Sequence, residues 1–78
     1  MINEVVYFAL LSEQAGCPRE RIEHAGGLRE LYAECTRRHG FTLAESSVRA
    51  AVNDEFVAWD HPLQDKDVVV FMPPVRGG

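Results

Sequence analysis

The end of the chain holds the residues whose types and spacing could support chemistry. The sequence closes with Pro73-Pro74-Val75-Arg76-Gly77-Gly78. Glycine lacks a Cβ and tolerates backbone angles that other residues avoid, so Gly77 and Gly78 predict a thin tip that can enter a narrow channel in another protein. The reactive group would be the terminal carboxylate of Gly78. Because a carboxylate is a poor acyl donor, we expect it to require activation before it could react.

Two prolines predict how this tail leaves the fold. Pro73 and Pro74 fix φ and donate no backbone hydrogen bond, so they end the apolar run Val68–Met72. We therefore expect residues 73–78 to form an extended tail, with Val75 and Arg76 along its length and conformational freedom at its glycines. The alternative is an ordinary frayed terminus that carries glycines.

The side chains form no comparable constellation. The three histidines, His24, His39 and His61, are far apart in the sequence and lie near no arrangement typical of nucleophilic catalysis. Cys17 and Cys35 match neither a CxxC motif nor a Cys/His ligand spacing, which favours two reduced thiols over a disulfide. The sequence thus predicts no metal site, no cofactor bound by this chain and no catalytic constellation among its side chains.

Length and composition limit the possible functions. At 78 residues, we expect residues 1–78 to form one domain, and 46% hydrophobic content supports a real core. The net charge of −4 argues against a nucleic-acid-binding surface and is compatible with a partner whose facing surface is basic. The early Glu4 and the short apolar run Val5–Leu11 give no secretion signal, and no stretch could span a membrane. We expect a cytoplasmic protein.

The first part of the chain predicts a strand, a short helical turn and a second strand. The run Ile2–Leu11 is rich in β-branched and aromatic residues and fits a central strand covered on both faces. Ser12 can cap a helical turn that ends at Ala15 and is closed by Gly16. The charged segment Arg19–Ala25 fits an edge strand.

One long helix is expected over Leu28–His39. Its apolar residues Leu28, Leu31, Tyr32 and Cys35 follow the i, i+3, i+4, i+7 spacing of a buried face, and Gly40 is a stop signal. The remainder predicts a loop, three short strands and two turns. These are the loop Phe41–Ser47, the strands Val48–Val52, Phe56–Ala58 and Val68–Met72, and turns at 53–55 and 60–67.

The two most apolar strands are the first and the last, so we expect them to lie side by side in the centre of the sheet. The long connection between them permits a parallel pair. With the helix across one face, this arrangement is a mixed α+β sheet of the β-grasp, or ubiquitin-like, type.

Strand alternation predicts a partner surface. Glu4, Val6 and Phe8 fall on one face of the first strand, and Glu4 marks that face as the outer one. Because the helix covers only the other face, Phe8, Phe56 and Met72 are candidates for an exposed apolar patch beside the tail, which usually indicates a protein partner. The alternative is that Phe56 folds inward over the other two.

Five short motifs are spread from the first strand to the C-terminus. They are Tyr7-Phe8-Ala9, Ala50-Ala51-Val52-Asn53, Asp60-His61-Pro62-Leu63, Asp65-Lys66-Asp67 and Phe71-Met72-Pro73-Pro74-Val75-Arg76-Gly77-Gly78. Together they resemble the small, sulfur-carrying subunits of molybdopterin synthase, which are ubiquitin-like proteins. The chain departs from that family at Ser12, where Arg is frequent, and at Lys66, where Gly is usual and Lys would cost roughly 1 kcal/mol in a left-handed conformation.

The resemblance implies a function for the tail. An activating enzyme that uses ATP and Mg²⁺ would adenylate Gly78, and a sulfur donor would convert it to a thiocarboxylate. The tail would then enter the active site of the synthase large subunit, within a heterotetramer, and give its sulfur to cyclic pyranopterin monophosphate in molybdenum cofactor biosynthesis. The resemblance also implies that the sheet face docks on the partner.

Three alternatives remain open from the sequence. A thiamine-pathway sulfur carrier also ends in Gly-Gly on this fold, although Pro73-Pro74 argues against it. A ubiquitin-like modifier joined to lysines is suggested by the ending Arg76-Gly77-Gly78. The third is an interaction domain with an inert tail, which would tolerate loss of its two glycines.

Overall fold

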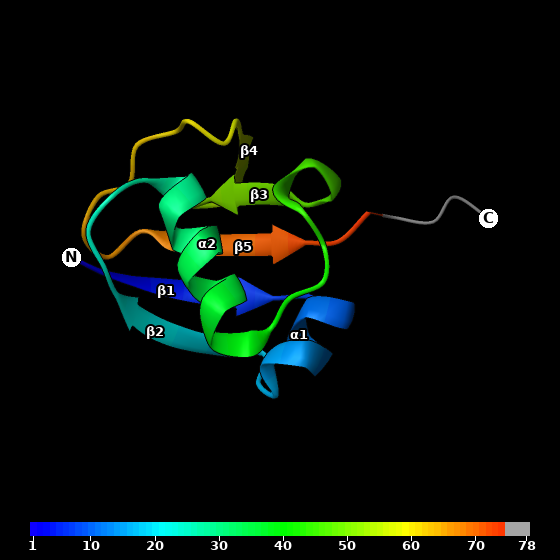
Figure 1. The fold of residues 1–78 in the computed structure, drawn as a ribbon. Helices are drawn as coiled ribbons and strands as arrows, with labels where there is room; N and C mark the ends of the chain where they lie inside the picture. The colour runs from blue at the N-terminus through cyan, green and yellow to red at the C-terminus, as the bar shows by residue number, and fades with distance from the viewer. Residues whose placement is uncertain (75–78) are drawn as a thin grey trace.

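The computed structural model describes residues 1–74 and shows two α-helices, one 3₁₀ helix and five strands in these residues (Figure 1). In chain order they are β1 (Ile2–Tyr7), α1 (Leu10–Ala15), β2 (Arg19–Glu23), α2 (Leu28–His39), η1 (Glu45–Ser47), β3 (Arg49–Val52), β4 (Glu55–Val57) and β5 (Val68–Met72).

The five strands form one mixed sheet in the order β2-β1-β5-β3-β4. The first and last strands are central and parallel, with Val5 opposite Val69 and Tyr7 opposite Phe71, and the other three pairings are antiparallel. Helix α2 crosses one face of the sheet (Figure 1). The prediction of an α+β, β-grasp fold with a parallel central pair is therefore confirmed.

The core lies between α2 and the sheet face that it covers. All four residues of the predicted helix stripe are buried, and Leu31 and Cys35 have no exposed surface. They meet the inward-facing residues of the central strands, among them Val5, Val69 and Phe71, which are also fully buried. The helix ends at Gly40, which adopts φ 68° and donates its N–H to the Thr36 carbonyl, as the stop signal predicted.

The boundary after β1 differs from the prediction. The strand ends at Tyr7 rather than Leu11, because the chain turns back at Phe8: the Leu11 N–H donates to the Phe8 carbonyl at 3.1 Å. Helix α1 begins at Leu10, so Ser12 lies inside it and does not cap it. The residue at the N-cap is Ala9, with φ 51° and ψ −126° and no side-chain cap. An apolar run does not reveal such a turn.

Smaller differences concern the ends of other elements. Strand β2 ends at Glu23 instead of Ala25, β3 begins at Arg49, and β4 covers Glu55–Val57. The segment predicted as a loop before β3 contains the short helix η1.

Candidate docking face and carrier tail

The root of the tail lies at the end of the central strand β5. Met72 is its last residue, and Pro73 and Pro74 follow outside any strand, as the two prolines predicted. The predicted tail residues Val75, Arg76, Gly77 and Gly78 lie outside the described residues. Strands β1 and β3 flank β5, so the tail starts between them, in the middle of the sheet.

The outer face of the sheet is the face opposite α2. The strand registers place the following side chains on it: Ile2, Glu4, Val6, Arg19, Arg21, Glu23, Arg49, Ala51, Phe56, Val68, Val70 and Met72. Val5 and Tyr7, which alternate with Glu4 and Val6, are buried under the helix. The predicted division of the sheet into inner and outer sides is what the structure shows.

The predicted apolar patch, formed by Phe8, Phe56 and Met72, lies on this side. Phe8 is 49% exposed and Phe56 59% exposed, whereas Met72 is half-buried. The Phe8 N–H donates to the Phe71 carbonyl at 3.2 Å, which fixes Phe8 beside the end of β5. Phe56 does not fold inward, so the alternative of an internal Phe56 is wrong.

Arg49 connects the parts of this patch and was missed in the sequence. It is the first residue of β3, directly opposite Met72, and its guanidinium carbon lies 4.3 Å from the centre of the Phe56 ring. Its alternation with the buried Ala50 could have signalled an outward side chain. The sequence carried no signal for the stacking on Phe56, because that contact depends on the pairing of β3 with β4.

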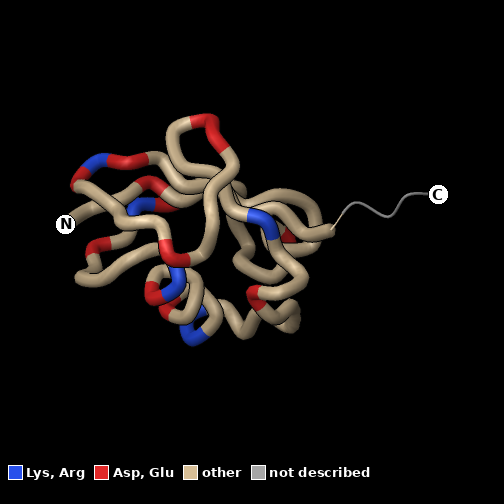
Figure 2. The backbone as a smooth tube through the Cα atoms, turned by 90° about the horizontal axis from the view of Figure 1, so that it is seen from above, with Lys and Arg blue, Asp and Glu red and all other residues tan. Residues whose placement is uncertain are grey.

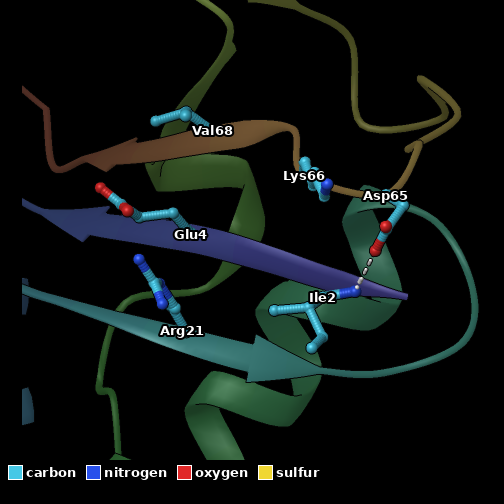
Figure 3. A pocket seen from close by; sticks show the side chains of 6 residues that line it. All are labelled: Ile2, Glu4, Arg21, Asp65, Lys66 and Val68. Atoms are coloured by element: carbon cyan, nitrogen blue, oxygen red, sulfur yellow. Dashed lines mark hydrogen bonds between the residues drawn. The ribbon is translucent and has the colours of Figure 1, made fainter.

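A hollow lies on the outer face near Val68, where β5 begins. It has a volume of about 380 Å³ and is lined by Ile2, Glu4, Arg21, Asp65, Lys66 and Val68 (Figure 3). The Ile2 N–H donates to Oδ1 of Asp65 at 2.7 Å, so this carboxylate holds the turn against β1. Lys66 has φ 71°, the left-handed conformation considered above for this position because Gly is usual there in the family that the chain resembles.

Asn53 fixes the start of β5. It lies in the turn predicted at 53–55 with a left-handed φ of 50°, and its side chain forms two hydrogen bonds. It donates from Nδ2 to Oδ1 of Asp67 at 2.9 Å and accepts the Val68 N–H on Oδ1 at 3.0 Å. These hydrogen bonds tie the β3–β4 turn to the strand that carries the tail, so Asn53 and Asp67 have a structural role.

A polar cluster lies inside the fold between β1, β2 and α2. The Tyr7 hydroxyl donates to Oε2 of Glu20 at 2.6 Å and lies 3.2 Å from Sγ of Cys35, and His39 contacts the same carboxylate. Because the hydroxyl proton goes to Glu20, the Cys35 thiol is left to donate to the hydroxyl oxygen. These residues are far apart in the sequence, and the pairing of β1 with β2 together with the packing of α2 brings them into contact.

The environment of this cluster shifts its titrations. Burial, with hydrogen bonds to Cys35 and Glu20, raises the pKa of Tyr7 far above its ordinary value. Burial also raises the pKa of Cys35 to about 11. For Glu20, burial acts to raise the pKa, but hydrogen bonds from Tyr7 and His39 outweigh it and hold the pKa below its ordinary value. A buried neutral thiol is a poor nucleophile, which fits a structural role for Cys35.

The described residues show no metal-binding group and no basic stripe. Within residues 1–74, no group of three or more His, Cys, Asp or Glu side chains is placed to hold a metal ion. Acidic and basic residues are dispersed over the backbone without one extended basic stripe in this part of the chain (Figure 2). Cys17 and Cys35 are both free thiols, as predicted.

None of the helices in the described part of the chain is both long enough and apolar enough to cross a membrane.

Comparison with known proteins gives the fold a family. The ThiS family model matches residues 5–78. The molybdopterin synthase sulfur carrier subunit of Escherichia coli (strain K12) is 35% identical to the chain over 79 aligned positions, which cover 96% of this chain and 98% of that protein.

Two solved structures extend the similarity to three dimensions. The putative molybdopterin converting factor subunit 1 of Pyrococcus furiosus has a TM-score of 0.84 and 36% identity, covering 96% of this chain and 99% of that one. The protein–protein complex of subunits 1 and 2 of the molybdopterin-converting factor from Helicobacter pylori 26695 contains a chain with a TM-score of 0.73 and 32% identity, with both chains fully covered. Fold, sequence and family model agree, and this β-grasp chain belongs to the ThiS family, within which it is similar to the sulfur carrier subunits of molybdopterin synthase.

Proposed function

We propose that this chain is the sulfur-carrier subunit of a molybdopterin synthase and acts in molybdenum cofactor biosynthesis. The observation that carries the proposal is its similarity along nearly the whole length, at 35% identity, to the Escherichia coli subunit of that name. The family match continues through residue 78, so the terminal glycines belong to the shared region.

In the proposed cycle, all covalent chemistry occurs at Gly78. Within an activating enzyme that binds ATP and Mg²⁺, the Gly78 carboxylate attacks the α-phosphorus of ATP, which gives an acyl adenylate and releases pyrophosphate. Sulfur from a donor, at the oxidation level of hydrosulfide, then attacks the acyl carbon, and AMP leaves. The resulting thiocarboxylate enters the active site of the large subunit, where its sulfur bonds to cyclic pyranopterin monophosphate. Water then cleaves the acyl–sulfur bond, which leaves the sulfur on the acceptor and restores the Gly78 carboxylate. The chain itself binds no cofactor in this cycle.

The arrangement of the molecule supports this division of labour. The tail begins at Pro73, at the end of a central strand that is hydrogen-bonded on both sides, so its root is rigid. The apolar patch lies beside that root and offers a surface for the protein that receives the tail. A complex of the two homologous subunits has been solved for Helicobacter pylori, which supports a large subunit as the partner.

The proposal is tested by weighing the intact protein after incubation with activating enzyme, ATP, Mg²⁺ and a sulfur source. The natural chain should gain the mass difference of one sulfur for one oxygen. Deleting Gly78 should abolish this change while the thermal melt stays the same, because the carboxylate then ends one residue short of the adenylation site. Gly77→Val should also fail, through the bulk of a β-branched side chain in the channel, whereas Arg76→Ala should be converted. Full conversion of the Gly78 deletion would show that the carrier proposal is wrong.

The product, together with an assay of molybdopterin formation, separates the carrier proposal from two alternatives. A thiamine-pathway carrier would form the same thiocarboxylate but would not restore molybdopterin formation with a large subunit. A ubiquitin-like modifier would instead form an isopeptide bond with lysines of other proteins, visible as a mass increase on the target.

The apolar patch gives the proposal a separate test. Phe8→Ala and Met72→Ala should weaken binding to the large subunit more than they lower the melting temperature, because truncating an interface anchor commonly costs about 2 kcal/mol or more of binding. Ile2→Ala is the matched control, since Ile2 is 47% exposed on β1 but lies at the end of the sheet away from the tail. Titration calorimetry and thermal melts measure the two effects. A lowered melting temperature with unchanged binding would show that Phe8 and Met72 belong to the hydrophobic core and not to the interface.

A further inference from the structure

Arg49 is a charged residue placed at the root of the carrier tail. It lies directly opposite Met72 in the β3–β5 register, and Met72 precedes the first residue of the tail. Its side chain is exposed on the outer face, between the half-buried Met72 and the exposed ring of Phe56. A protein that covers the apolar patch must therefore also cover Arg49.

The Phe56 ring holds the charge in place. The guanidinium carbon of Arg49 lies 4.3 Å from the ring centre, within the range of a cation–π contact. A planar guanidinium stacked on a ring keeps its edge donors free, and it has already lost much of its rotamer freedom. Such a pre-ordered group binds a partner at a lower entropic cost than a mobile side chain does.

The charge of Arg49 is not neutralised within the described residues. Arg19, Arg29, Arg37 and Arg38 each pair with a glutamate. Arg49 forms no ion pair with any of residues 1–74. A partner that covered this guanidinium without a compensating charge would pay for its desolvation.

The local charge of the face differs from the net charge of the chain. The registers place three arginines and two glutamates on it: Arg19, Arg21, Arg49, Glu4 and Glu23. One of these glutamates, Glu4, is already paired with Arg19. The chain carries −4 in total, which alone indicates a basic partner, but the docking face beside the tail presents an available positive charge.

We infer that Arg49, held over Phe56, is a specificity contact of this docking face and that its partner is a carboxylate on the surface of the synthase large subunit. This inference rests on the proposed function, from which the identity of the partner comes. The surface that receives the tail is thus apolar opposite Phe8, Phe56 and Met72, and acidic opposite Arg49. The contact fixes the docked position of the sheet, and so the point from which the tail enters the partner.

The test measures the dissociation constant of the full chain for the molybdopterin synthase large subunit of the same organism, at low and high salt. Arg49→Glu should weaken binding at low salt by at least about tenfold, the effect of losing an interfacial charge pair and adding repulsion. Arg49→Met, which keeps an apolar stem over Phe56, should lose less affinity and should show a weaker salt dependence than the natural chain. Arg37→Glu, the same change of charge on the exposed side of α2, is the control and should bind as the natural chain does.

A double-mutant cycle tests the role of the ring. If Phe56 pre-orders Arg49, Phe56→Ala should cost less affinity in the Arg49→Met background than in the natural chain. Equal or tighter binding by Arg49→Glu, with the natural chain binding normally, would overturn the inference and leave the proposed function intact. Failure of the natural chain to bind the large subunit would overturn the proposed function and this inference with it. Thermal melts of each variant separate lost binding from lost folding.

Discussion

Ala9 occupies a backbone conformation that suits glycine. Its φ of 51° with ψ −126° brings Cβ close to the backbone, and no side-chain hydrogen bond caps the helix that it starts. Such residues cost on the order of 1–3 kcal/mol and persist where the surrounding structure fixes them. At Ala9 the surrounding structure is the turn between β1 and α1, which also places Phe8 beside the root of the tail.

Ala9→Gly should therefore raise the free energy of unfolding, by roughly 1 kcal/mol after the greater freedom of glycine in the unfolded chain is subtracted. Urea unfolding followed by circular dichroism measures it. Ala33→Gly, at an exposed position inside α2, is the matched control and should destabilise by about 1 kcal/mol. A loss of stability in Ala9→Gly would mean that its conformation carries no strain.

At the scale of elements, α2 packs against the sheet through a single apolar face. Leu31 lies in the middle of that face and has no exposed surface. Leu31→Ala should cost roughly 2–5 kcal/mol, because it removes buried methyl groups and leaves a cavity. Leu10→Ala makes the same chemical change in α1 at a side chain that is 40% exposed, and should cost much less. The two midpoints of denaturant unfolding would coincide only if the face of α2 were assigned wrongly.

At the scale of the whole molecule, the cluster of Tyr7, Glu20, Cys35 and His39 links folding to alkaline pH. The pKa of Cys35 is about 11 in the fold against 9.0 ordinarily, and burial raises the pKa of Tyr7 as well. The unfolded chain therefore loses these protons at lower pH than the native chain. Between the pKa of the unfolded chain and the higher pKa of the fold, the native state binds more protons than the unfolded state does. The free energy of unfolding is therefore highest below about pH 9 and falls as the pH rises further.

The expected slope is about 1.4 kcal/mol per pH unit for each proton by which the two states differ. Urea midpoints measured from pH 7 to 11 should show this decline. Cys35→Ala should reduce the slope by removing one of the titrating groups, whereas Cys17→Ser, at a half-buried position outside the cluster, should leave it unchanged. A slope that is the same in Cys35→Ala would assign the alkaline sensitivity to other groups.

The sequence by itself determined the elements whose signal is periodic and long. The spacing of Leu28, Leu31, Tyr32 and Cys35 predicted α2 and its buried face, and the strong apolar character of the first and last strands predicted their central, parallel pairing. Alternation along β1 and β5 also identified the outer face and predicted an exposed Phe8, whereas Phe56 was a candidate for the same patch whose inward-folded alternative only the structure excluded. These features follow from local patterns, because burial of a face requires the same residue type at every turn or every second residue.

Only the tertiary structure decided which distant residues meet. The end of β1 at Tyr7 depends on a turn at Phe8 and Ala9 that an apolar run conceals. The contacts of Arg49 with Phe56, of Asn53 with Asp67 and Val68, and of Tyr7 with Glu20 and Cys35 each join segments that are paired through the sheet or packed across it. Strand register, and for Cys35 the packing of α2 on the sheet, fixes these contacts. Both are properties of two segments together, so neither segment's sequence specifies them alone.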